Sequence, residues 1–354
     1  MNMKVCMTSI AAAAAMLLSV SCSDSKYRAP EFPVEREGCW EIISGELYFN
    51  LVNDIFEYDT CLVVPSYDLK THNTLHIYSR NSGKKIYTGI YSGRGDGETI
   101  DGYRRASLKN GVLSYVSMIS GDVLSVPIES LLDTVLKPDF RSVSIRLPEW
   151  CQYAVPMDDG YFYVTNVGYL SDDTVSRFIM ERNGAITERL NYFPIEDKEK
   201  SFTMYNYSSY AISPDRTKFV IGTPFGAIME IYLLDSTIEH EVTKFFYEPD
   251  FEVTFGSYDY TKGTVLGFHD IYVTDDRIYG VYDGERNPYY AGEERLVDTK
   301  IAVFDWEGNP LELIRTDYCI DRICYSEREN AIYGAVRDID DIMYLARLDL
   351  NRLD

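Results

Sequence analysis

A glycine-rich loop carries the densest group of charged residues suited to ligand binding. It runs from Gly93 to Glu98 as Gly-Arg-Gly-Asp-Gly-Glu, and two further arginines follow it closely. Alternating glycines let backbone amides approach an anion, and arginine pairs well with a carboxylate. A phosphate loop would also need a Lys-Ser/Thr pair and a following helix, and the sequence offers neither. The candidate ligand-binding residues of this region are Arg94, Glu98, Arg104 and Arg105.

An ion pair is the simpler interpretation of the same loop, and we favour it for Arg94 and Glu98. Under that interpretation the two side chains bridge neighbouring structural units. Under the ligand interpretation, all four charged residues line one end of a central channel and bind a carboxylate or a sugar.

Tyrosine is the second feature that could serve binding, with 30 copies in the chain. Most of them are explained by strands with one packed and one wet face, where tyrosine fits well. Tyr289 and Tyr290 differ, because they stand in a polar loop between residues 283 and 294. We expect these two to be exposed, and they are candidate contacts for a ligand that stacks on aromatic rings.

Histidine gives little support for catalysis. The four copies, His72, His76, His240 and His269, are scattered without metal-ligand spacing. His269 and Asp270 begin a strand, and one interpretation pairs them in the channel. The alternative is a structural role, which is more common for a single histidine beside a strand. A Ser-His-Asp triad assembled from distant segments stays open, although no Gly-x-Ser-x-Gly turn supports it.

Acidic pairs and cysteines do not indicate a metal site. Asp158-Asp159 and Asp275-Asp276 stand where hairpins must reverse, so turns explain them better than calcium. Five cysteines follow Cys22, an odd number without Cys-x-x-Cys or Cys/His spacing, and we expect free thiols, mostly buried. No metal, cofactor or catalytic residue is therefore assigned. The five cysteines are Cys39, Cys61, Cys151, Cys319 and Cys324.

The N-terminus predicts export and lipidation. A single lysine, an apolar stretch from Ile10 to Leu18 and small residues from Ser19 to Ser21 precede Cys22. This arrangement is typical of a lipoprotein signal peptide over residues 1–21, with Cys22 acylated as the new N-terminus. A signal peptide with a chance cysteine is the alternative. Residues 22–38 contain prolines and charges without apolar periodicity, which predicts a flexible tether.

The formal charge of −22 restricts the partners. Nucleic-acid binding depends on neutralising phosphates and is not expected. An acidic surface also repels anionic headgroups, so contact with the membrane must come from the lipid at Cys22.

An internal repeat predicts the fold. Six times, a short strand leads through a polar turn into a second strand of aromatic and β-branched residues, at intervals of about 50 to 60 residues. Each interval suits one four-stranded sheet with its loops. The second strands contain Leu62, Leu113, Phe162, Phe219, Ile278 and Ile332.

These units predict an all-β, six-bladed β-propeller of four-stranded blades over residues 39–354. The last unit lacks its outer strand, and an open edge would invite aggregation. We expect part of the segment from Trp40 to Phe49 to complete the last blade and close the ring. A β-sandwich is the alternative, and the only helix candidate is a short one from Ile128 to Leu136.

The sequence also resembles a known family. Gly83-Lys84-Lys85 followed by the loop from Tyr91 to Glu98 is similar to the Gly-Arg-Gly-x-Gly-Glu loop of TolB-like six-bladed propeller lipoproteins of Bacteroidetes. The loop follows the outer strand of the first blade in that family, as it does in our repeat. The resemblance implies the propeller fold and an outer-membrane location rather than an activity. Asp24 resembles the acidic signals that send such lipoproteins to the cell surface, and a periplasmic orientation stays open.

We expect a lipid-anchored protein of the cell envelope that binds or scaffolds rather than catalyses. Its propeller loops or channel mouth would recognise a protein partner, a peptide or a glycan. The alternative is a hydrolase or lyase with its site at the channel mouth. A purely structural envelope component is the third possibility.

Overall fold

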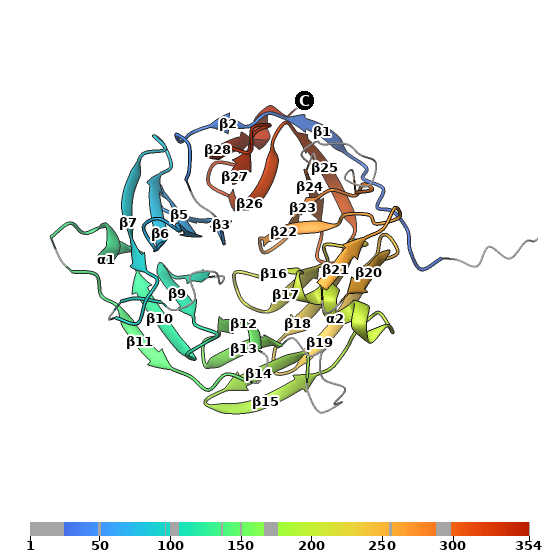
Figure 1. Cartoon of the computed structure of the whole chain (residues 1–354), viewed down its shortest axis with the longest axis horizontal. Coiled ribbons are helices and arrows are strands. Elements are labelled where there is room, and N and C mark those ends of the chain that lie inside the picture. The colour runs from blue at the N-terminus through green and yellow to red at the C-terminus, as the bar shows by residue number, and fades with distance from the viewer. Residues whose placement is uncertain are drawn as a thin grey trace, which may run out of the picture.

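β-strands make up most of the chain and form a ring of six sheets around a central axis (Figure 1). The computed structural model describes residues 25–48, 51–95, 97–99, 106–135, 137–148, 151–165, 176–254, 257–287 and 299–353. Cys22, Arg104, Arg105, Tyr289 and Tyr290 lie outside these ranges. The predicted all-β, six-bladed propeller is confirmed.

Each blade is an antiparallel sheet in which sequence order runs from the channel outward. Blade 1 contains β4 (Phe56–Tyr58), β5 (Cys61–Tyr67), β6 (Asn73–Ser79) and β7 (Lys85–Tyr91). Blade 2 contains β8 (Ala106–Lys109), β9 (Val112–Val116), β10 (Asp122–Pro127) and β11 (Arg141–Ser144). Blade 3 contains β12 (Cys151–Pro156), β13 (Gly160–Thr165), β14 (Phe178–Arg182) and β15 (Ala185–Leu190). Blade 4 contains β16 (Ser209–Ile212), β17 (Lys218–Gly222), β18 (Ile228–Leu234) and β19 (Ile238–Phe245). Blade 5 contains β22 (Phe268–Val273), β23 (Ile278–Tyr282), β24 (Lys300–Phe304) and β25 (Pro310–Thr316). Blade 6 contains β26 (Cys319–Ser326), β27 (Ala331–Arg337) and β28 (Met343–Asp349).

The six predicted hairpins are the inner strand pairs of the six blades. Four of the six turns have a residue in the left-handed region, which asparagine and aspartate tolerate better than most residues. Asp59, Asn110 and Asn330 take this conformation in blades 1, 2 and 6, with φ of 50°, 50° and 47°. In blade 4 the same conformation falls on Arg216, with φ of 61°.

The N-terminal segment closes the ring, as predicted. β2 (Glu41–Ile42) pairs antiparallel with β28 and becomes the outer strand of blade 6. Trp40, just before it, is buried. β3 (Leu51–Val52) then pairs with β5 in blade 1, so the same segment holds the last blade and the first.

The ordered packing begins before Cys39, inside the range expected to be a tether. β1 (Glu35–Gly38) pairs in parallel with β25 and adds a fifth strand to blade 5. Upstream, Phe32 packs 5.6 Å from the ring of Phe304, and Tyr27 packs 5.7 Å from Phe245. These aromatic side chains cover the edges of blades 4 and 5, and this burial explains why the segment follows the ring surface.

Among the described residues, two α-helices and one additional hairpin interrupt the blades. The short helix expected near Ile128 is α1 (Ile128–Leu132). α2 (Lys198–Asn206) was not predicted; Asp197 caps it by accepting a hydrogen bond from the Lys200 amide, and Met204 and Tyr205 are buried. The hairpin of β20 (Phe251–Thr254) and β21 (Ser257–Tyr260) follows blade 4. In the part of the chain that the structure describes, neither helix has the length and hydropathy of a bilayer-spanning segment.

Apolar clusters join neighbouring blades all the way around the ring. Within the described residues, each of the six blade interfaces has its own buried cluster. The cluster between blades 3 and 4 is rich in aromatic rings, with Phe162 and Phe219 only 4.9 Å apart. Beside it, the fully buried Arg177 pairs with Glu230 at 2.8 Å and stacks 3.9 Å over the ring of Tyr205 on α2.

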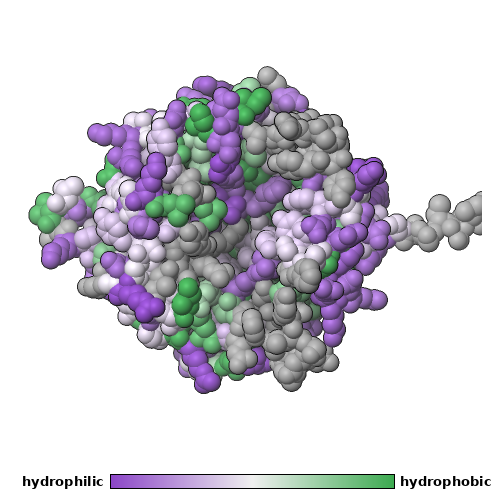
Figure 2. Space-filling model, in the orientation of Figure 1, coloured by the Kyte–Doolittle hydropathy of each residue, from purple (hydrophilic) through white to green (hydrophobic). Residues whose placement is uncertain are grey.

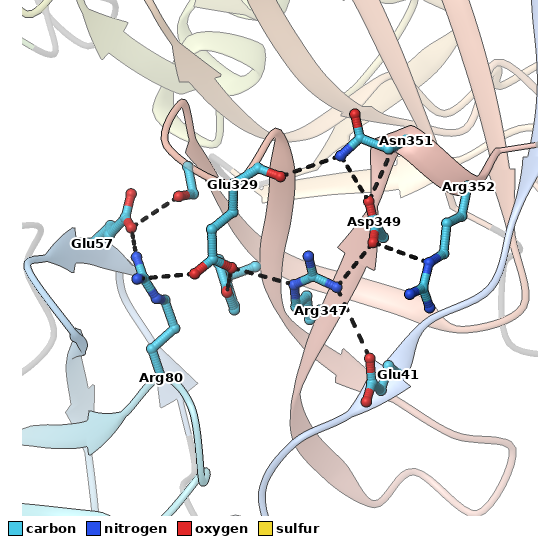
Figure 3. Close-up of polar contacts among 10 residues, drawn as sticks. Glu41, Glu57, Arg80, Glu329, Arg347, Asp349, Asn351 and Arg352 are labelled. Atoms are coloured by element: carbon cyan, nitrogen blue, oxygen red, sulfur yellow. Dashed lines mark hydrogen bonds and ion pairs between the residues drawn. The ribbon is translucent and has the colours of Figure 1, made fainter.

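A charge network reinforces the junction between blades 1 and 6 (Figure 3). The guanidinium of Arg80, with 2% of its side chain exposed, contacts Glu57 in its own blade and lies 2.9 Å from Glu329 in blade 6. Arg347 continues the chain of alternating charges, 3.4 Å from Glu329 and 3.3 Å from Asp349. We call Glu57, Arg80, Glu329, Arg347 and Asp349 the closure network.

We expect Arg80→Met to lower the free energy of unfolding by about 2–4 kcal/mol, because the substitution leaves two partly buried carboxylates without their shared cation. Equilibrium denaturation in urea measures the change. Arg352→Met is the matched control, since Arg352 also contacts the network at Asp349 but its side chain is 81% exposed. Equal losses in the two variants would contradict a special role for Arg80.

Candidate functional site: the central channel

The inner strands enclose a cavity of about 250 Å³ along the axis of the ring. All six blades contribute to its wall, so the cavity exists only in the closed ring. Figure 2 shows hydrophilic residues over much of the surrounding described surface, in keeping with the acidic composition. The polar and aromatic residues of the wall are Asp54, Phe56, Glu57, Ser107, Tyr153, Tyr210, Ser213, Arg216, Asp270 and Tyr272.

Two tyrosines form a rigid aromatic part of this wall. Tyr153 and Tyr210 stack with ring centroids 5.5 Å apart and planes 17° from parallel. The Tyr210 hydroxyl donates to the side chain of Gln152 and to the backbone oxygen of Tyr205, both at 3.2 Å. These hydrogen bonds fix the ring of Tyr210, and the ring of Tyr153 stacks against it.

Arg216 places a positive charge on the same wall. The residue is only 7% exposed, and its Nη1 atom is buried without a hydrogen-bond partner. Burial lowers the pKa of the guanidinium, and the nearby Tyr153 and Asp158 act in the opposite direction. Asp158 itself is exposed and is bonded to Lys109. An arginine keeps its charge in proteins, so the wall carries a cation that no side chain neutralises directly among the described residues.

The carboxylates of the wall are engaged in joining blades. Asp54 accepts a hydrogen bond of 2.9 Å from the amide of Ala106 in the next blade. Asp270 accepts one of 3.1 Å from the amide of Ile323 and lies 3.7 Å from Arg322. These contacts link neighbouring blades beside the channel.

His269 pairs with Asp283, not with its neighbour Asp270. Its Nε2 atom lies 2.7 Å from an oxygen of the buried Asp283, whose other oxygen has no hydrogen-bond partner among the described residues. His269 stands at an irregularity of β22, where the register with β23 shifts between Phe268 and Asp270. Burial lowers the pKa of His269, but the charge and hydrogen bond of Asp283 outweigh it and raise the pKa overall. Ser209 donates to the backbone oxygen of His269 rather than to the imidazole.

The sequence-predicted loop lies away from the channel. Arg94 and Glu98 border a separate cavity of about 440 Å³ that is also lined by Asp122 of blade 2. Glu98 accepts a hydrogen bond of 2.6 Å from the Gly95 amide and fills the space beside Gly93. Glu98 therefore closes the loop on itself, and no ion pair joins it to Arg94 in this described part of the chain. Neither residue belongs to the channel wall.

Sequence reasoning missed Arg216 and the His269–Asp283 pair. Arg216 stands in a hairpin turn, where the sequence nevertheless offered a usable signal. Three other blades place asparagine or aspartate at the left-handed turn position, and an arginine there is unusual. The partner of His269 is 14 residues away across a hairpin, which spacing alone does not reveal.

The five cysteines after Cys22 are free thiols, as expected, but only two of them are buried. The described residues contain no cluster of metal ligands. Cys61 and Cys324 are buried, and Cys39 is exposed. Cys319 and Cys324 both lie on the single strand β26. Burial raises the pKa of Cys319 to about 11.

Comparison with known proteins decides the family. A sequence profile described as TolB-like 6-blade propeller-like matches residues 35–328. The chain belongs to this family. The predicted resemblance is thereby confirmed for the TolB-like propeller, and no curated protein matches the sequence.

Solved structures resemble this TolB-like propeller in fold. A protein from Bacteroides fragilis described as exported is 12% identical, with a TM-score of 0.51 over 91% of this chain and 98% of that one. A DUF4221 family member from Bacteroides vulgatus is 10% identical, with a TM-score of 0.51 over 90% and 97%. Regucalcin from Agrobacterium tumefaciens, a calcium-binding protein, is 8% identical, with a TM-score of 0.50 over 89% and 96%. At these identities the likeness shows the fold alone.

The His269–Asp283 pair predicts a pH-dependent stability. The pKa of His269 is raised in the folded state, so its pairing stabilises the fold below the unfolded value of about 6.5 and is lost as pH rises through the folded value. We expect His269→Gln to be more destabilising at pH 5.5 than at pH 9 in urea denaturation. Asp283→Asn should remove the same pH dependence. A loss that does not change with pH would contradict the ion pair.

Proposed function

We propose that this TolB-like propeller is a lipid-anchored binding protein of the cell envelope, which takes part of a peptide, glycan or protein partner into its central channel. The observation that carries the proposal is the channel itself. Six blades build its wall, with stacked tyrosines and an unpaired arginine on one side. Such a wall offers shape, aromatic contact and charge, which are the features of a recognition site.

Binding is favoured over catalysis by what the polar groups of the channel do. Asp54 and Asp270 accept hydrogen bonds from neighbouring blades, so their carboxylates serve the ring. The alternative of a hydrolase or lyase rests on the His269–Asp283 pair, which has the geometry of an oriented base. A serine hydroxyl hydrogen-bonded to the His269 imidazole would strengthen the alternative. The hydroxyl of Ser209 instead donates to the backbone oxygen of His269.

The proposed location is the outer membrane, with Cys22 as the acylated residue and the propeller facing the periplasm or the cell surface. The apolar stretch and small residues before Cys22 support acylation, and Asp24 supports the surface orientation. The charge of −22 supports attachment by lipid rather than by a basic patch.

We expect Cys22→Ala to release the protein from the membrane fraction and to abolish labelling by a fatty-acid probe, because the thiol accepts the lipid. Fractionation of cells followed by immunoblotting measures the release. Cys39→Ala is the matched control, since Cys39 is exposed but lies after β1 in the folded domain. A Cys22→Ala protein that stays with the membrane and keeps its label would contradict the anchor.

Filling the channel should abolish ligand binding. We expect Ser107→Trp, on the wall, to remove any ligand mass carried by the wild-type protein purified from its own envelope, as measured by native mass spectrometry. Ser82→Trp, at an exposed turn, should keep that mass. Retention of the ligand by Ser107→Trp would move the binding site to the loops, and a wild-type protein without ligand mass would count against a channel ligand.

A further inference from the structure

Arg216 differs from the other buried or half-buried arginines of the ring. Arg80 pairs with Glu57 and Glu329, and Arg177 forms a two-pronged pair with Glu230 at 2.8 and 3.0 Å. Each of these cations was taken out of water together with a carboxylate, as the cost of desolvation requires. Arg216 is nearly as deeply buried, at 7% exposed, yet no carboxylate of the described residues forms an ion pair with its guanidinium. Its Nη1 atom lacks a hydrogen-bond partner, as the Nε atom of Arg80 also does, so the missing ion pair is what distinguishes Arg216.

The surrounding groups do not supply the missing anion. Asp158 is the acidic residue that acts on Arg216, but its side chain is 86% exposed and bonded to Lys109. Asp215, next in the chain, is occupied within the turn, where its carboxylate accepts from Ser213 and Thr217. The charge therefore remains available on the channel side, where Arg216 lines the cavity.

The turn that carries Arg216 is firmly held in a conformation that arginine disfavours. Ser213 accepts hydrogen bonds from the amides of Thr217 and Lys218, at 3.1 and 2.9 Å. These hydrogen bonds keep Arg216 at a φ of 61°. This left-handed backbone conformation costs free energy for any residue that carries a side chain. Strain of this kind at a cavity wall is more often found where a side chain has a task besides packing.

We infer that Arg216 is an anion-recognition residue of the channel and that the channel ligand carries one carboxylate. This inference rests on the proposed function of the channel as a binding site. The carboxylate meets the Arg216 guanidinium, and the rest of the ligand lies along the stacked rings of Tyr153 and Tyr210.

The acidic residues of the cavity limit the ligand to a single negative charge. Asp54, Glu57 and Asp270 line the same 250 Å³ as Arg216. A second anionic group on the ligand would be held close to these carboxylates and repelled by them. A monocarboxylate, from the C-terminus of a peptide or from an acidic sugar, satisfies both constraints.

Isothermal titration calorimetry on the full-length protein tests the inference with a matched panel of probes. The panel holds a tyrosine-containing dipeptide with a free carboxylate, the same dipeptide amidated, galacturonate and galactose. We expect one of the two acids to bind and its neutral counterpart to bind at least about tenfold more weakly. The acid that binds identifies the source of the carboxylate. Equal binding of acid and neutral probes, or no binding by either acid, would overturn the inference.

Variants separate recognition from structure. We expect Arg216→Met to weaken binding of the acid at least about tenfold and to leave the ligand-free protein as stable as the wild type, because the guanidinium has no partner to lose. Arg216→Lys should restore part of the affinity. Arg177→Met is the contrasting control and should lower stability by leaving Glu230 unpaired. A destabilised Arg216→Met that still binds the acid would overturn the inference.

Native mass spectrometry distinguishes this inference from the proposed function. An envelope ligand retained by Arg216→Met but lost from Ser107→Trp would show a channel ligand that needs no arginine, which overturns the inference alone. Loss of the ligand from both variants supports both statements.

Discussion

The short pairing of β2 with β28 is the contact on which the rest of the molecule depends. Each blade packs on the next through side chains, so the ring closes only where the N-terminal strand enters the last blade. The pairing supplies the backbone partner that β28 otherwise lacks at its outer edge. The closure network adds charge complementarity at the same junction and fixes which blades meet. Without this closure the six inner strands would not face one another, and the channel would not exist.

The structure uses buried arginines mainly to join segments that lie far apart in the sequence. Arg80 links blade 1 to blade 6, Arg177 links blade 3 to blade 4 beneath α2, and Arg322 reaches from blade 6 to Asp270 of blade 5. Because acidic residues outnumber basic ones in this chain, a buried arginine usually has a carboxylate within reach to pair with. An arginine that is buried and unpaired, as Arg216 is, is therefore informative, because its partner must come from outside the protein or its desolvation goes uncompensated.

Local turn chemistry explains what the sequence could predict. The inner hairpins combine a period of two with Asp, Asn or Gly at the reversal, and both signals are contained within a few residues. α2 escaped prediction because Lys198–Asn206 shows no apolar stripe, and its stability depends on the Asp197 cap and on burial of Tyr205 against Arg177. The parallel pairing of β1 with β25 depends on residues about 280 positions apart, for which no local pattern exists. The channel wall could not be predicted for the same reason, because it is assembled from all six blades, whereas the glycine loop was visible as a local motif.

Ordered packing of the N-terminal segment also determines how the proposed anchor would present the ring. Tyr27 already contacts Phe245 of blade 4, and the Arg28 amide donates to the backbone oxygen of the same residue. Tyr27 is the fifth residue after Cys22, so the path between them is at most about 18 Å when fully extended. A lipid on Cys22 would thus hold the rim of blades 4 and 5 close to the headgroups rather than on a long tether. Because the ring is acidic, that proximity is opposed by charge repulsion from anionic lipids, and the hydrophobic insertion of the acyl chains must exceed it.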